Sequence, residues 1–224
     1  MFCVSLVRSL ILPLLAAALT LFLPKSCVGA PVDAPAFSPT QETATVQEEP
    51  RDFLRVELGE EAIFRGDLIL VNNQIPFRFP ETQELVSVSE GKSGSYFVRS
   101  LDMLAAPDAL GAVNAMLDDF IAQGGSKTIN LVALWRSVDT QRRLFDSSAA
   151  RNGAEHALRY VALPGHSEHH TGLAADFSLY FSDGTSADFT GEGEYAWITE
   201  NAPRYGLILR YREEKETLTG IAWE

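Results

Sequence analysis

The feature that most constrains the fold of this chain is a group of histidines placed directly before a segment with the alternation of a β-strand. His166, His169 and His170 are three of its four histidines and fall within five positions. Thr171-Gly172 follows and disfavours a continuous helix, so we expect His169 on a turn that enters the strand. From 173 to 181 the side chains alternate between two faces: one carries Leu173, Ala175, Phe177 and Leu179, and the other Ala174, Asp176, Ser178 and Tyr180.

The same segment offers two candidate metal ligands. Asp176 lies on the less apolar face of the strand, beside the small Ala174, where a metal ion has room. A neutral imidazole and a carboxylate are both good zinc ligands. We therefore take His169 and Asp176 as candidate ligands of Zn²⁺. Their spacing alone also fits a polar loop that leads into an ordinary strand, so this interpretation depends on the flanking residues.

Two other segments carry clear secondary-structure signals. Apolar residues at helical spacing predict a helix over 107–123, with Pro107 suited to its first turn and Gly124-Gly125 at its end. Residues 128–135 are β-formers that are apolar on both faces, which predicts a central strand.

Weaker signals predict the remaining elements. Ser137 can cap a helix whose one side holds Leu144, Phe145 and Ala149. We expect a short strand at 67–71, a helix over 196–205 and a strand over 207–211. Strands and helices mix without regular βαβ spacing, which indicates an α+β fold.

Residues 1–30 have the layout of a secretory leader. Arg8 gives a positive start, residues 9–23 are a 15-residue apolar run, and small residues end at Ala30, near the expected cleavage site. The run is shorter than the roughly 20 residues that span a bilayer comfortably. A cleaved signal peptide and a retained membrane anchor through 9–23 both remain open. Either way we expect the rest of the protein outside the cytoplasm, secreted or anchored to the outer face of the membrane.

The remainder divides into a linker and one domain. Residues 31–58 begin with a stretch rich in Pro, Thr, Ala and Glu, which predicts a flexible linker. Residues 59–224 are expected to form the folded domain, which we take to be monomeric. The cysteines, Cys3 and Cys27, both fall in the leader, so we expect no disulfide in the exported part.

The charge balance excludes one class of partner. The chain has 18 Lys and Arg residues against 30 Asp and Glu residues, a net charge of −12. Binding to a phosphate backbone needs clustered positive charge. We therefore expect no nucleic-acid partner.

The residues around the histidines resemble a known family. Ser167, His169, Gly172, Ala174 and Asp176 meet each fixed position of a Ser-x-His-x-x-Gly-x-Ala-x-Asp pattern that is similar to the signature of VanY-type zinc D-alanyl-D-alanine carboxypeptidases. Further matches in the same order are Trp135-Arg136-Ser137, Gln141, Trp197, Asn201-Ala202, Tyr205-Gly206, Arg210-Tyr211 and 219–224. The resemblance covers roughly 60–224.

This resemblance implies a fold and a set of roles. The fold would be hedgehog/DD-peptidase-like, with a central, mostly antiparallel sheet flanked by helices. His169 and Asp176 would bind zinc, and Glu224 would be the general base. Arg136 would act in catalysis and in binding of the substrate carboxylate, with Gln141 and Ser167 as further substrate-binding residues.

The resemblance also implies what the sequence should contain after Glu224. The family run continues Glu-Pro-Trp-His, so a third zinc ligand is expected three residues beyond Glu224. We therefore expect the domain to be truncated, with its final strand missing and with little activity in the chain as it stands. Substitution of the third ligand by His166 or His170 is an alternative.

The implied substrate is the peptidoglycan stem peptide, from which the enzyme would remove the terminal D-alanine. The same motifs also fit an L,D-carboxypeptidase or a peptidoglycan endopeptidase. A non-catalytic wall-binding module is a third hypothesis, against which Glu224 argues, because a purely structural metal needs no base.

Overall fold

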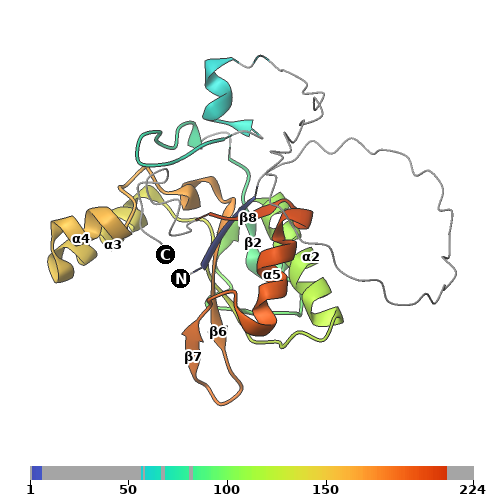
Figure 1. Cartoon of the computed structure of the whole chain (residues 1–224). Coiled ribbons are helices and arrows are strands. Elements are labelled where there is room, and N and C mark those ends of the chain that lie inside the picture. The colour runs from blue at the N-terminus through green and yellow to red at the C-terminus, as the bar shows by residue number, and fades with distance from the viewer. Residues whose placement is uncertain (1, 7–56, 58, 67–68, 81–82, 211–224) are drawn as a thin grey trace, which may run out of the picture. The chain divides into compact units, whose positions relative to one another are not determined.

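The computed structural model describes residues 2–6, 57, 59–66, 69–80 and 83–210 (Figure 1). The chain divides into one unit of residues 1–9 and 59–224 and another of residues 10–58. All the helices and strands below belong to the first unit. Among the described residues, no helix is both long enough and apolar enough to cross a membrane. The apolar run 9–23 and the linker apart from residue 57 lie outside them, so the predictions of a leader and a flexible linker stay predictions.

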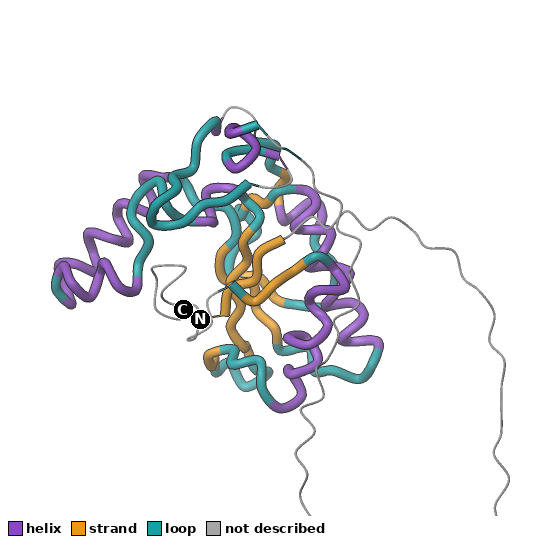
Figure 2. Tube along the Cα trace, turned by 45° about the horizontal axis from the view of Figure 1, so that its top comes forward, coloured by secondary structure: helices purple, strands orange, loops and turns teal. Residues whose placement is uncertain are grey.

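A mixed sheet forms the centre of this unit, with helices packed against it (Figure 2). Its strands follow the order β3-β5-β6-β1-β8, and β7 pairs with β6. β3 and β5 are parallel, whereas every other described pair in the sheet is antiparallel. The strands are β1 (Phe2–Leu6), β3 (Phe97–Val98), β5 (Ile129–Ala133), β6 (Ala174–Tyr180), β7 (Ser186–Asp188) and β8 (Leu207–Leu209); β2 (Val86–Ser87) and β4 (Leu104–Ala105) form a separate antiparallel pair. The α+β prediction with a mostly antiparallel sheet is confirmed.

The helices are short except for two. α2 (Pro107–Ala122) follows the predicted bounds to within one residue, and α3 (Val138–Asn152) begins after Ser137, whose Oγ accepts a hydrogen bond from the N–H of Thr140 at 3.1 Å. The others are α1 (Val88–Gly91), α4 (Ala154–Tyr160), α5 (Ala196–Asn201) and the 3-10 helices η1 (Glu60–Ile63), η4 (Glu168–Thr171), η5 (Gly193–Tyr195) and η6 (Ala202–Tyr205).

The core lies between α2 and the sheet. Val113, Met116 and Leu117 of α2 are fully buried, and so are Leu131 of β5 and Phe177 of β6. Burial of one such side chain contributes about 1.5–3 kcal/mol. The apolar face of β6 therefore packs into the core, which leaves the Asp176 face on the other side of the strand.

β1 comes from the segment that the sequence assigns to a leader. Its backbone pairs with β6, with Cys3 opposite Asp176, and with β8, with Val4 opposite Leu209. Because β1 pairs antiparallel with a strand on each side, it supplies hydrogen-bond partners to backbone N–H and C=O groups of both β6 and β8. Residues 2–6 thus occupy the position between β6 and β8.

Two sequence predictions differ from the structure. Residues 69–71 form a loop rather than a strand, because the N–H of Leu70 donates to the carbonyl of Ile63 instead of to a sheet partner. The prediction that Leu144, Phe145 and Ala149 share one side of α3 is wrong for Leu144. Leu144 is 43% exposed, whereas Phe145 and Ala149 are partly buried on the side of the helix that also buries Gln141 and Ser148.

Candidate metal centre

The turn that carries His169 is fixed at both of its ends. η4 begins after Ser167, whose Oγ accepts a hydrogen bond from the backbone N–H of His169 at 3.4 Å. It ends at Gly172, where φ is +72°. A Cβ on this residue would lie 2.9 Å from the backbone nitrogen of Ala106, so the position requires glycine. The expected turn ahead of the strand is confirmed.

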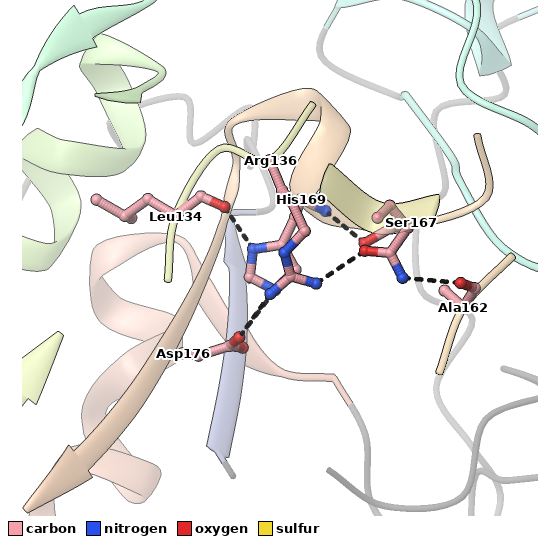
Figure 3. A network of polar contacts seen from close by, with 7 residues as sticks. Leu134, Arg136, Ala162, Ser167, His169 and Asp176 are labelled. Carbon is pink, nitrogen blue, oxygen red and sulfur yellow. Dashed lines mark hydrogen bonds and ion pairs between the residues drawn. The ribbon is translucent and has the colours of Figure 1, made fainter. Parts of the chain in front are cut away.

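Asp176 lies opposite this turn on β6. The register of β5 and β6 places it across from Ala133, so the chain leaving β5 passes beside its side chain. Asp176 Oδ2 is 3.1 Å from His169 Nε2, and both side chains are buried (Figure 3). His169 Nδ1 donates a hydrogen bond to the carbonyl of Leu134 at 2.5 Å. That bond fixes the ring so that Nε2 is turned toward the carboxylate.

The electrostatics of the pair call for a cation. Burial by itself lowers the pKa of His169, but the charge of Asp176 and the hydrogen bond to it outweigh burial, and the pKa is raised overall. In neutral His169, Nδ1 holds the proton and Nε2 has a lone pair that faces a carboxylate oxygen. Such a contact is stable only when a positive species, a proton or a metal ion, lies between the two atoms.

These two side chains fit a zinc ion. His169 Nε2 is buried, with no hydrogen-bond partner in the described part of the chain besides its contact with Asp176. An imidazole nitrogen and a carboxylate oxygen are typical zinc donors, and a backbone carbonyl on the second imidazole nitrogen is the usual way of orienting such a ligand. The pair supplies two ligands. No group of three or more His, Cys, Asp or Glu residues suited to a metal occurs within the described residues.

Arg136 joins the same site from the segment after β5. Its Nη2 lies 3.6 Å from Asp176 Oδ2, and its Nη1 donates to Gln141 Oε1 at 2.9 Å. Gln141 is 1% exposed, and its Nε2 donates to the carbonyl of Ala162 at 2.7 Å. The amide of Gln141 is thus engaged inside the protein and holds the guanidinium toward Asp176.

The structure brings four of the predicted site residues together and places a fifth beside them. His169, Asp176, Arg136 and Gln141 form one connected network. Ser167 adjoins it, 3% exposed, and caps the turn. The substrate contacts predicted for Gln141 and Ser167 stay predictions. Glu224 lies outside the described residues.

The two neighbouring histidines have other partners. His170 Nδ1 donates to the carbonyl of Arg136 at 2.7 Å, and its Nε2 accepts from the N–H of Gly165 at 3.1 Å. Both ring nitrogens are therefore occupied by the backbone, and burial lowers the pKa of His170. His166 Nδ1 contacts the carbonyl of Asn72 at 2.9 Å. The two occupied nitrogens argue against His170 as a substitute ligand, whereas substitution by His166 stays a prediction.

Several supporting residues cannot be found from local sequence patterns. Gln83 accepts a hydrogen bond from Trp135 Nε1 at 3.0 Å and donates to the carbonyl of His170, so it ties the two flanks of the site together. Arg210, just after β8, donates to Glu168 Oε1 at 2.5 Å and links the end of the sheet to η4, the turn that carries His169. These pairs are 52, 87 and 42 residues apart. The match of Arg210 to the family run was the one available signal.

Comparisons with solved structures identify the class. The chain aligns with a crystal structure of the D,D-dipeptidase VanXYg in complex with a D-Ala-D-Ala phosphinate analogue at 33% identity and TM-score 0.62, covering 75% of this chain and 64% of that one. It aligns with the LD-carboxypeptidase LdcB at 29% identity and TM-score 0.57, covering 70% and 72%. The fold is therefore that of the hedgehog-like peptidases.

Comparisons of sequence identify the family within that class. A family model described as VanY, D-alanyl-D-alanine carboxypeptidase, matches residues 103–224, and the chain belongs to this family. A D-alanyl-D-alanine carboxypeptidase of Enterococcus faecium is 32% identical over 170 residues, which are 75% of this chain and 52% of that protein. The chain spans about half the length of the curated relatives that it matches.

Proposed function

We propose that this protein is a zinc-dependent D-alanyl-D-alanine carboxypeptidase that removes the terminal D-alanine from peptidoglycan stem peptides outside the cytoplasm. The observation that carries the proposal is the contact between His169 Nε2 and Asp176 Oδ2 at 3.1 Å, in a buried site beside Arg136. Family membership supports the reaction class. The leader-like residues 1–30 support the location.

His169 and Asp176 would hold the metal. When bound, zinc supplies a Lewis acid for the scissile carbonyl and a water of lowered pKa. Leu134 keeps the proton of His169 on Nδ1, which leaves Nε2 as a ligand. Glu224 would accept a proton and pass it to the leaving amine, as the family resemblance implies.

Arg136 would balance negative charge in the reaction. Its guanidinium already lies 3.6 Å from the carboxylate of Asp176, and Gln141 fixes its orientation. A charge held in place in a water-poor site stabilises a developing oxyanion without reorganisation, an effect often worth about 3–4 kcal/mol. Arg136 is also suited to the terminal carboxylate of the peptide, since its planar donors match two acceptor oxygens.

The test is the release of D-alanine from a defined pentapeptide that ends in D-Ala-D-Ala. The protein expressed from its complete gene is incubated with the peptide in the presence of zinc, after chelation, and after zinc is restored. We expect release that chelation abolishes and zinc restores, and that Asp176→Asn lowers at least about 100-fold. Release that persists after chelation would contradict the metal-dependent proposal.

A parallel assay with a tetrapeptide distinguishes a D,D-carboxypeptidase from an L,D-carboxypeptidase. LdcB, which shares this fold, is an LD-carboxypeptidase by name. An enzyme of that specificity would release D-alanine from a tetrapeptide ending in a single D-alanine and leave the pentapeptide intact. Release from the pentapeptide alone supports the D,D assignment, and binding of either peptide without any cleavage supports the non-catalytic wall-binding module.

A further inference from the structure

His170 is a buried imidazole that the proposed mechanism does not use. It follows the candidate ligand His169, is 1% exposed, and contacts the main chain through both ring nitrogens. The N–H of Gly165 can only donate, so Nε2 accepts, and the carbonyl of Arg136 can only accept, so Nδ1 holds the proton. One tautomer of the neutral ring therefore satisfies both contacts and joins two segments of the chain.

The main chain of Arg136 is held at both of its polar groups by the turn η4. Its N–H donates to the carbonyl of His169 at 3.0 Å, and its carbonyl accepts from His170 Nδ1 at 2.7 Å. The guanidinium of the same residue lies 3.6 Å from Asp176 Oδ2. The imidazole of His170 thus helps to set where the arginine side chain begins, and with it where the guanidinium lies beside the metal centre.

Further contacts fix His170 itself. Gln83 Nε2 donates to the carbonyl of His170, and Gln83 Oε1 accepts from Trp135 Nε1 at 3.0 Å, so the segment after β5 is tied to η4 a second time. The carbonyl of Gly165 accepts from the N–H of Phe77 at 2.7 Å, and the Phe77 ring packs against the imidazole with centroids 6.1 Å apart. The imidazole therefore cannot turn without breaking contacts to several segments.

We propose that His170 is a positioning residue of the carboxypeptidase, which acts through the main-chain carbonyl of Arg136 to hold the guanidinium at the metal centre. The inference rests on the proposed function and adds to it a residue that acts through another side chain. A displacement of about 1 Å in a catalytic site can lower the rate about 100-fold. Loss of the contact with Arg136 should therefore slow the reaction and leave the zinc ligands in place.

Two amide substitutions separate the two ring contacts. The side-chain nitrogen of asparagine can take the place of His170 Nδ1, and the side-chain oxygen of glutamine the place of Nε2. His170→Asn thus keeps the donor to Arg136, whereas His170→Gln keeps only the acceptor for Gly165.

The test measures kcat/KM for the pentapeptide and zinc affinity in proteins expressed from the complete gene. We expect kcat/KM to fall about 10- to 100-fold in His170→Gln. It should stay within about threefold of the wild type in His170→Asn and in the exposed control His156→Gln. Zinc affinity should be the same in all of these proteins. A His170→Gln protein that is no slower than His170→Asn, or that loses zinc affinity, would overturn the inference.

A double-mutant comparison distinguishes positioning of Arg136 from a general loss of structure. In Arg136→Ala there is no guanidinium to hold, so the addition of His170→Gln should lower kcat/KM by less than about a further threefold. A further loss as large as that in the wild-type background would overturn the inference.

A measurement that does not depend on activity completes the design. If the wild type cleaves no peptide, the proposed function fails, and ¹⁵N relaxation of the Arg136 Nε–H group then decides the inference. We expect a lower order parameter in His170→Gln than in the wild type and His170→Asn, because the arginine is less firmly held. Equal order parameters in the three proteins would overturn the inference.

Discussion

Replacement of Gln141 by leucine tests how the candidate site is held together. The side chain is 1% exposed, and its amide makes two hydrogen bonds, one from Arg136 Nη1 at 2.9 Å and one to the carbonyl of Ala162 at 2.7 Å. Leucine fills a similar volume but leaves a buried carbonyl and part of a guanidinium without these partners. Each group left unsatisfied costs about 1–3 kcal/mol.

We therefore expect Gln141→Leu to lower the free energy of unfolding by about 2–4 kcal/mol, after allowance for the favourable burial of the leucine side chain. For a protein of this size that corresponds to a fall in Tm of about 4–16 °C. Equilibrium denaturation in guanidinium chloride, followed by circular dichroism, measures the change without reference to activity.

The control for this experiment is Gln123→Leu, at the exposed C-terminal end of α2, which should change the free energy of unfolding by less than about 0.5 kcal/mol. A Gln141→Leu protein as stable as the wild type would show that the amide of Gln141 does not satisfy Arg136 and Ala162 in the folded protein. The role of Gln141 in holding the guanidinium would then have to be abandoned.

Three further predictions address the surroundings of the site. Gly172→Ala should cost about 1–3 kcal/mol of stability, because φ is +72° and the backbone of a neighbouring residue blocks a Cβ; a melting curve like that of the wild type would contradict this. Glu168→Gln should lower the free energy of unfolding by about 1–2 kcal/mol, because its ion pair with Arg210 is partly buried. Glu61→Gln, which removes an exposed ion pair, should lower it by less than about 0.5 kcal/mol. Equal losses of stability in urea denaturation would refute this distinction between the two ion pairs. Burial and a nearby carboxylate raise the pKa of the Tyr96 phenol in the folded protein. The stability that the phenol adds is therefore present below its unfolded pKa of about 10 and is lost as pH rises above that value. The difference in free energy of unfolding between the wild type and Tyr96→Phe should become smaller from pH 8 to pH 11, and a constant difference would argue against the raised pKa.

The parts of the fold that the sequence predicts correctly are those specified by local residues. The helix over 107–123 depends on apolar spacing within one segment, and the turn at His169 depends on the glycine three residues later. Strand β6 follows from alternation alone. Each of these signals involves only a few neighbouring residues, so it can be interpreted without knowledge of the tertiary structure.

The parts that it predicts poorly depend on contacts between distant segments. Leu144 is predicted to share a side of α3 with Phe145 and Ala149, but it is exposed, and α3 packs its Gln141 side inward, where the amide meets a guanidinium and a backbone carbonyl. Periodicity cannot distinguish a helix that covers an apolar core from one that supports a polar site. The contacts of Gln83 and the position of β1 between β6 and β8 are likewise invisible to local patterns.

The candidate site shows the same division. His169 and Asp176 can be identified from a short motif because they lie seven positions apart on one turn and one strand. The orientation of the imidazole by Leu134 cannot be identified from the motif, because it depends on the pairing of β5 with β6. That bond decides which nitrogen is available to a metal, so the tertiary structure adds the chemistry that the motif lacks.

Zinc titration tests whether His169 and Asp176 together hold a metal ion. The protein expressed from its complete gene is stripped of metal and titrated with zinc against a chromophoric chelator, alongside His169→Ala, Asp176→Asn and the exposed control His156→Ala. We expect one zinc per wild-type chain, unchanged zinc affinity in His156→Ala, and zinc affinity reduced at least about 100-fold in each of the other variants. Zinc binding that is equally tight in all four proteins, or absent from the wild type, would contradict this expectation.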